Sequence, residues 1–159
     1  MTTAMIKIVD YEPKHQPHFD RLNKAWIEKY FWLEPIDEFV LGSPEEAILK
    51  AGGYIFMAMY GNDVAGTVAL LKVDDTTYEF TKMAVDEGYR RKGIAEALSL
   101  AAISKARELR ADNIILYSQT GLTAAILLYR KLGFEEVPLD AGVYKRSDIK
   151  MQLQLNNQL

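Results

Sequence analysis

The residues best suited to hold an anion follow one another in the segment Arg90-Arg91-Lys92-Gly93-Ile94-Ala95. This segment follows an apolar run that ends at Val85, and it opens a run of helical periodicity that continues to Leu109. A helix N-terminus offers unpaired amides and a partial positive charge, and glycine lets a bulky anion approach the backbone. The pattern favours a phosphate site, although a basic loop before a capped helix has the same composition. Neither a Walker motif nor a Gly-x-Gly-x-x-Gly fingerprint is present.

Two ionisable side chains occur where burial would change their chemistry. Tyr129 falls on the same helical stripe as Leu122 and Ala125, so its ring is expected to face a sheet rather than water. Glu79 lies inside a mostly apolar strand, where a carboxylate is costly unless it has a function or a partner. The simpler interpretations are a core tyrosine and a glutamate paired with Lys82 or another basic group.

The elements that must position these residues indicate a mixed α/β (α+β) domain. Strand patterns cover residues 6–8, 54–60, 64–73, 77–85, 113–117, 134–137 and 149–155. Helical patterns cover residues 16–30, 93–109 and 122–132, with a further helix between a Ser43 cap and Ala51-Gly52-Gly53. The middle strands form an antiparallel meander, and the later strand–helix–strand unit implies a parallel crossover. We predict one domain over residues 5–155, with a mixed sheet flanked by helices and a tail at 156–159.

The composition limits the class of protein. The chain has 159 residues, 49% apolar and 26% charged, as in ordinary globular domains, and its net charge of −3 disfavours a general nucleic-acid binder. The absence of cysteine removes thiolate metal sites and a cysteine-linked acyl intermediate. His15 and His18 are too few for a metal cluster and are expected to be surface or capping groups. With no visible signal peptide or membrane-spanning run, we expect a cytoplasmic protein with no metal, nucleic-acid or membrane partner.

Two motifs resemble the GNAT superfamily of N-acetyltransferases. Its pyrophosphate motif, Gln/Arg-x-x-Gly-x-Gly/Ala, corresponds to Arg90 to Ala95, and Lys82-Met83-Ala84-Val85-Asp86 resembles the strand end before it. Its Leu-Tyr-x-Lys-x-Gly-Phe signature corresponds to Leu128-Tyr129-Arg130-Lys131-Leu132-Gly133-Phe134. The order of elements agrees from about residue 5 to 155. The resemblance implies a GNAT-like fold with a mixed, mostly antiparallel central sheet in which one parallel strand pair is splayed.

The resemblance also implies acetyl-CoA as a co-substrate. The backbones of Met83 and Val85 would pair with its pantetheine arm, and Ser118 would stand where the sheet opens to admit that arm. Arg130 or Lys131 would meet the nucleotide phosphate, unless these two are only solvated surface groups. The remaining implied cofactor-binding residues are Arg90, Arg91, Lys92, Gly93, Ile94, Ala95, Glu96 and Ala125. One departure is Leu122, where the family often has an asparagine; Ser118, Gln119 or Thr120 would take over its hydrogen bond.

The resemblance assigns catalytic roles to Tyr129 and Glu79. The attacking amine must be neutral, and an alkyl ammonium has a pKa of about 10.4 in water, so a base or a water chain must remove its proton. Glu79 stands where some family members carry a catalytic glutamate and is the candidate base. Tyr129 is the family's recurrent tyrosine and is the candidate acid that reprotonates the leaving thiolate.

The resemblance places the acceptor beside the first two helices and the loop between them. The candidate acceptor-binding residues of this region are Tyr30, Phe31, Trp32 and Glu34, with Asp37 and Glu38 nearby. Aromatic faces and carboxylates together suit a cationic amine. The simpler interpretation is that the aromatic residues cover the core and the acids keep the loop soluble.

These inferences predict an N-acetyltransferase that moves an acetyl group to a primary amine by direct attack in a ternary complex. The acceptor would be a small amine or a peptide amine, and a homodimer is compatible with the fold. The alternatives are an acyltransferase with another acyl-CoA or an O-acceptor, and a non-catalytic module that binds acyl-CoA.

Overall fold

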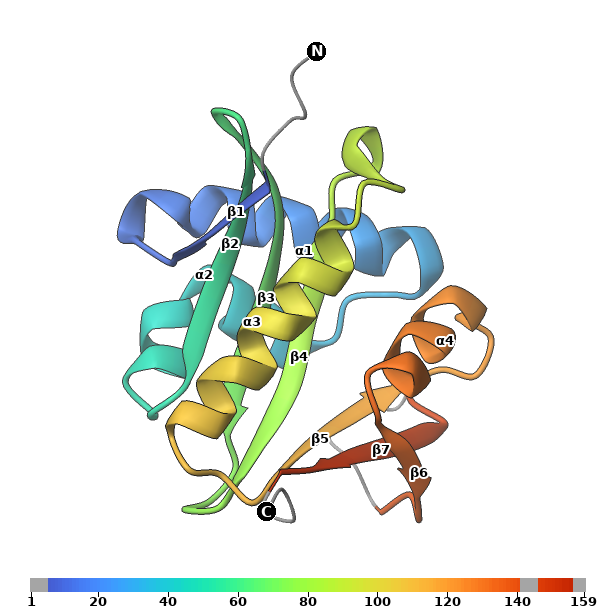
Figure 1. The fold of residues 1–159 in the computed structure, drawn as a ribbon. Coiled ribbons are helices and arrows are strands. Elements are labelled where there is room, and N and C mark those ends of the chain that lie inside the picture. The colour runs from blue at the N-terminus through green and yellow to red at the C-terminus, as the bar shows by residue number, and fades with distance from the viewer. Residues whose placement is uncertain (1–5, 141–145, 156–159) are drawn as a thin grey trace.

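A seven-stranded sheet forms the centre of the computed structural model, which describes residues 6–140 and 146–155 (Figure 1). The strand order is β1-β2-β3-β4-β5-β7-β6. The strands are β1 (Ile6–Asp10), β2 (Tyr54–Tyr60), β3 (Asp63–Lys72), β4 (Thr77–Val85), β5 (Asn113–Ser118), β6 (Glu135–Val137) and β7 (Ile149–Gln154). Every neighbouring pair is antiparallel except β4 and β5, which confirms the predicted mixed, mostly antiparallel sheet. The expected tail at 156–159 lies outside the described residues.

Helices cover both faces of the sheet (Figure 1). One face packs against α1 (Gln16–Tyr30) and α2 (Pro35–Gly42), through a core that includes Phe19 and Leu41. The other face packs against α3 (Ile94–Glu108) and α4 (Thr123–Lys131), through a core that includes Leu98. Short helical turns lie in the segments that connect the longer elements: η1 (Pro13–His15) before α1, η2 (Glu45–Leu49) before β2 and η3 (Glu87–Tyr89) before α3.

The parallel pair β4 and β5 separates along its length, as the resemblance implies. The two strands are in register only at Thr77, Tyr78 and Glu79 of β4. Beyond Glu79 they diverge, and Figure 1 shows β5, β7 and β6 turning away from the first four strands. The V-shaped opening therefore begins just after Glu79.

A β-bulge lies in β4 beside this opening. The register between β3 and β4 shifts between Thr67 and Ala69, and Lys82 has a φ of 56°. A left-handed backbone is rare for a residue with a side chain, so the surrounding contacts must hold Lys82 there. The bulge bends the strand and redirects the side chains around it.

The segment between α1 and β2 differs from the prediction. A helix that was not predicted, α2, begins at Pro35. The Glu34 and Asp37 side chains form a capping box at its start, and proline suits the first helical position. The helix predicted from a Ser43 cap is only the single π-helical turn η2, and the cap is wrong because Ser43 instead ends α2. The predicted capping role fits His15, whose Nδ1 accepts a hydrogen bond from the Glu12 amide, although its side chain is buried.

Within the described ranges, no helix combines the length and apolar character needed to cross a membrane. The same residues contain no cluster of three or more His, Asp or Glu side chains arranged to hold a metal ion.

Candidate active site

A groove lies between the N-terminal ends of α3 and α4. Its wall includes Gly93 and Ala95 at the start of α3, Thr123 at the start of α4, and Met83 and Val85 of β4. No side chain caps either helix. Two sets of unpaired helix amides and two positive dipole ends therefore meet in this groove, which suits an anionic ligand.

The backbone before α3 is shaped as an anion cradle. Arg91 and Gly93 both have left-handed conformations, with φ of 63° and 84°. A Cβ atom on Gly93 would meet nothing within 4 Å, so the conformation, and not crowding, is the reason for glycine here. The amides of Ile94, Ala95 and Glu96 follow directly and belong to residues of the groove wall.

The basic side chains of this loop contact other parts of the chain. Lys92 Nζ lies over the Tyr60 ring, 5.3 Å from its centroid, and Lys92 is not part of the groove wall. Arg90 and Arg91 do line the groove, and a hydrogen bond from Arg90 lowers the pKa of Tyr30, which lines it too. Two of the three basic side chains are therefore engaged by tyrosines, whereas the backbone from Gly93 into α3 borders the groove.

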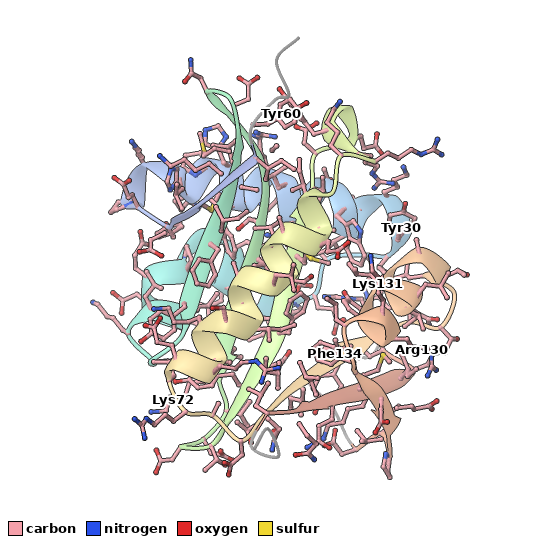
Figure 2. All side chains as sticks on the ribbon, in the orientation of Figure 1. Tyr30, Tyr60, Lys72, Arg130, Lys131 and Phe134 are labelled. Carbon is pink, nitrogen blue, oxygen red and sulfur yellow. The ribbon has the colours of Figure 1, made fainter. Side chains whose placement is uncertain are left out.

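Two further predicted cofactor residues lie on α4 (Figure 2). Lys131 Nζ is 3.0 Å from Glu96 Oε1, and this ion pair joins α4 to the first turn of α3. Arg130 is exposed at the same end of α4. The pairing with Glu96 reduces the positive charge that Lys131 can offer a phosphate.

One edge of β4 is unpaired beside the groove. On one side the strand pairs with β3 through Val85, but on the other it pairs with β5 only as far as Glu79. The amides and carbonyls that face the opening beyond Glu79 therefore have no strand partner among the described residues. Such an edge can accept an extended ligand as an added strand, and Met83 and Val85 lie on this stretch.

The groove continues into an inner cavity at the opening of the V. Trp26, Met83, Leu122 and Ala125 line both spaces. The other cavity residues come from α1, β4, β5, α4 and the segment before β7: Asn23, Ile27, Phe31, Phe80, Thr81, Lys82, Leu116, Tyr117, Ser118, Gln119, Tyr129, Arg146 and Ser147.

Tyr129 is one of the residues that line this cavity. Its ring makes edge contacts with Phe80 and Phe134, at centroid distances of 5.7 and 5.9 Å, and only 8% of the residue is exposed. Burial raises the pKa of Tyr129 to about 12, so the phenol keeps its proton at neutral pH. It can therefore donate a hydrogen bond to a sulfur atom on which negative charge develops.

Glu79 lies at the apex of the V and is not part of the cavity wall. It is 6% exposed, and burial raises its pKa to about 7, with Lys82 and Lys150 opposing that shift and Asp140 adding to it. Neighbouring strand residues point to opposite faces, so Glu79 lies across the sheet from Phe80 and Tyr129. A carboxyl group with this pKa can act as a general base, but Glu79 does not itself line the cavity.

The expected partner of Glu79 is engaged elsewhere. Lys82 Nζ donates a hydrogen bond of 2.9 Å to Asp37 Oδ1, and both side chains are buried. Asp37 also accepts hydrogen bonds of 2.9 and 3.0 Å from Arg146, which bonds Glu34 at 2.8 Å. The chain thus contains a buried network of two carboxylates and two cations.

The network fixes the charge state of its central carboxylate. Burial alone would raise the pKa of Asp37, but hydrogen bonds from Arg146 and the Glu34 amide, together with Lys82, hold the pKa at about 2. The Arg146 guanidinium also lies over the Phe31 ring, 5.9 Å from its centroid. Asp37 is therefore ionised and binds two cations of its own chain.

This arrangement changes the interpretation of the predicted acceptor loop. Phe31 lines the inner cavity and Tyr30 lines the groove, but Trp32 is 58% exposed and lines neither. The Glu34 carboxylate is bonded to Arg146, so it is not presented to an incoming cation. Sequence analysis did not identify Arg146, because a basic residue shortly before a final strand carries no recognisable pattern.

Ser118 lines the cavity, as its predicted position implies. The other residues considered as replacements for an asparagine at Leu122 bond mainly to the segment before β7. Gln119 bonds the Arg146 carbonyl and the Gly121 amide, and Thr120 bonds Asp148 through both its amide and its hydroxyl.

Comparison with known proteins identifies the family. The model of the acetyltransferase (GNAT) family matches residues 14–134, more than half of the chain. The uncharacterized N-acetyltransferase YvbK of Bacillus subtilis (strain 168) is 32% identical over 116 residues, which cover 71% of this chain and 75% of YvbK.

Solved structures share the fold. An acetyltransferase of the GNAT family from Staphylococcus aureus Mu50 superposes with a TM-score of 0.84 at 22% identity, covering 94% of this chain and 99% of that one. The PaiA N-acetyltransferase from Thermoplasma acidophilum, solved in complex with coenzyme A, superposes with a TM-score of 0.74 at 15% identity, covering 95% and 99%. With the family model, the relative and the site geometry in agreement, the chain belongs to the acetyltransferase (GNAT) family.

Proposed function

We propose that this protein transfers the acetyl group of acetyl-CoA to a primary amine by direct attack in a ternary complex. The observation that carries the proposal is the continuity of three features. The amide cradle at Gly93, the unpaired edge of β4 and the cavity that holds Tyr129 lie along one connected groove and cavity. A ligand with a pyrophosphate, an extended arm and a reactive end matches that order.

The donor would be held mainly by backbone groups. The amides from Arg91 to Glu96 would bind the pyrophosphate, and Met83 and Val85 would pair with the pantetheine arm as an added strand. Coenzyme A bound to PaiA, a relative in fold, supports this choice of ligand. The arm would then point its thioester into the inner cavity.

In the chemical step, the amine nitrogen attacks the thioester carbonyl carbon, the C–N bond forms and the C–S bond breaks. The electron pair of the broken bond goes to sulfur, and the amine loses one proton. Glu79, with a pKa of about 7, would accept that proton through water. Tyr129 would donate its hydroxyl hydrogen bond to the departing sulfur. Because a free thiol has a pKa of about 8.5, below that of this phenol, stabilising the thiolate comes before any full proton transfer.

The test is a free-thiol release assay with acetyl-CoA and a panel of amino acids, polyamines, aminoglycosides and basic peptides. Release that depends on an amine supports the transferase, and mass spectrometry of the product should show one added acetyl group. A thermal shift with acetyl-CoA but no release with any amine would instead favour the non-catalytic module. Release with propionyl-CoA or with alcohols that exceeds release with acetyl-CoA and amines would favour the other acyltransferase alternatives.

A further inference from the structure

The wall of the inner cavity has an unusual distribution of charge for a site that accepts amines. Among the described residues that line it, two carry a positive charge, Lys82 and Arg146, and none carries a carboxylate. The polar groups between them are neutral and include Ser118 and Ser147. A protonated amine would meet like charge on this wall.

The carboxylates that balance these cations do not line the cavity. Asp37 is fully buried and Glu34 is 9% exposed, and neither lines the cavity. Both cationic residues of the network thus contribute to the cavity wall, whereas its two carboxylate residues do not. Because Coulomb energy falls with distance, a ligand in the cavity experiences the nearer positive groups most strongly.

Arg146 is held rigidly in this layer. Its two terminal nitrogens make three hydrogen bonds of 2.8 to 3.0 Å to Glu34 and Asp37, and its guanidinium lies over Phe31. An arginine fixed in this way has already lost its side-chain freedom, so binding a further carboxylate, beyond Glu34 and Asp37, costs little further ordering. Its planar array of donors matches a carboxylate.

We propose that the acceptor carries a carboxylate close to its amino group, as an amino acid does, and that Arg146 binds this carboxylate at the cavity wall. The inference rests on the proposed acetyl transfer and specifies its substrate class. Anchoring the carboxylate at Arg146 leaves the amino group to approach the unpaired edge of β4, where the thioester would lie. The same positive groups disfavour the ammonium form and polyamines.

The test compares matched acceptors in the thiol-release assay. For each of several side chains, the free amino acid is measured against its carboxamide and against the amine that lacks the carboxyl group. The free acids should have kcat/KM values roughly 10- to 100-fold higher than the carboxamides, as expected when a charged hydrogen-bond partner is lost. The carboxamide has the less basic amino group, so amine ionisation works against this ranking. Carboxamides, simple amines or polyamines that react as fast as the acids would overturn the proposal.

Variants locate the effect at Arg146. Arg146→Gln should lower the ratio of kcat/KM for the free acids to kcat/KM for the carboxamides by roughly tenfold or more, whereas Arg146→Lys should recover part of this discrimination. Arg107→Gln, an exposed arginine near the end of α3, is the matched control. Unchanged acetyl-CoA affinity shows that a variant is folded, and equal losses for acids and carboxamides would contradict the assigned role.

A binding measurement separates this inference from the proposed function. Calorimetric titration of amino acids and their carboxamides is carried out on the wild-type chain saturated with CoA. Binding of the acids but not of the carboxamides, without turnover of any amine, would support the carboxylate site and contradict the transferase. Turnover without discrimination between acids and carboxamides would support the transferase and overturn the carboxylate site.

Discussion

At the scale of single residues, burial determines what the two candidate catalytic groups can do. The same desolvation that raises the pKa of Tyr129 to about 12 raises that of Glu79 to about 7. The phenol is thereby kept as a hydrogen-bond donor, while the carboxyl group is brought close to neutral pH, where a base exchanges protons readily. One physical effect would thus give the proposed hydrogen-bond donor and the proposed base from two acids.

Replacing Tyr129 with phenylalanine removes the hydroxyl and keeps the ring contacts with Phe80 and Phe134. We expect kcat to fall roughly 10- to 100-fold, with acetyl-CoA affinity changed by less than about threefold. Steady-state kinetics and calorimetry measure the two quantities. Tyr78→Phe, at another buried tyrosine of the same core, is the control. Unchanged turnover in Tyr129→Phe rules out the donor role.

Replacing Glu79 with glutamine should change the pH dependence of stability. The folded pKa lies above the ordinary value of 4.5, so the folded state binds more protons than the unfolded state between pH 4.5 and about 7, and stability falls as pH rises through this window. The variant lacks this loss, which is at most about 3 kcal/mol. Urea unfolding from pH 4 to 8.5 gives the free energy of unfolding of both proteins. The free energy of the variant should rise relative to that of the wild type up to about pH 7 and then stay level. If the difference between the two free energies does not change with pH, the raised pKa is contradicted.

The same variant tests Glu79 as the base. If this carboxylate accepts the proton, the acidic limb of the wild-type kcat/KM profile should have its midpoint near pH 7 and should disappear in Glu79→Gln. An unaltered acidic limb removes the base role and leaves Glu79 as a structural carboxylate.

At the scale of elements, the start of α3 and the edge of β4 would form the proposed donor site from backbone groups. The loop reaches α3 through left-handed residues at Arg91 and Gly93, and β4 keeps its edge because β5 leaves it after Glu79. Lys92 instead lies over Tyr60. Side chains of this loop are therefore expected to tune affinity, while backbone shape determines it.

We predict that Gly93→Val raises the dissociation constant for acetyl-CoA by roughly tenfold or more, because a β-branched residue at a φ of 84° strains the cradle. Arg91→Gln and Lys92→Gln should each have a smaller effect, about threefold or less for Lys92. Gly61→Val is the matched control, since Gly61 also has a positive φ and open space but lies in the β2–β3 turn. Calorimetry gives the dissociation constants. If Arg91→Gln or Lys92→Gln weakens acetyl-CoA binding more than Gly93→Val does, the cradle interpretation is wrong.

At the scale of the whole molecule, the buried network joins segments that are distant in sequence. Asp37 of α2 binds Lys82 of β4 and Arg146 before β7, so the acceptor loop, the bulged strand and the last part of the sheet are tied at one carboxylate. Such a network is weak evidence for stability, but removing one partner leaves buried charges without compensation.

Asp37→Asn should lower the free energy of unfolding by about 3–5 kcal/mol at neutral pH. Because the folded pKa of Asp37 is about 2, below the ordinary 3.8, its ionisation stabilises the fold fully above pH 3.8 and this contribution is lost as pH falls through 2. The difference in free energy of unfolding between the wild type and the variant should therefore shrink by roughly 2 kcal/mol at acid pH. Glu46→Gln, which breaks an exposed pair with Lys50, is the control and should cost less than about 1 kcal/mol. A neutral effect of Asp37→Asn would show that the network does not hold the three segments.

Much of the fold could be predicted from the sequence because local patterns report local structure. Alternating apolar residues marked the strands, and Gly93 with its basic neighbours marked the start of α3. Helix α2 was not predicted, because a proline directly after one helix usually indicates its end, while here Pro35 begins a new helix that the capping box of Glu34 and Asp37 starts. The Ser43 cap failed for the related reason that a good cap residue also occurs where a helix ends.

By itself, the sequence determined the family motifs, the mixed sheet with its splayed parallel pair, and the segments that border the donor groove. Only the tertiary structure decided how the charges pair. Ion pairs between Asp37, Lys82 and Arg146 depend on three segments meeting in space, and no spacing along the chain encodes that meeting. For the same reason the acidic appearance of the segment around Asp37 did not reveal that the cations of its network, Lys82 and Arg146, line the inner cavity while its carboxylates do not.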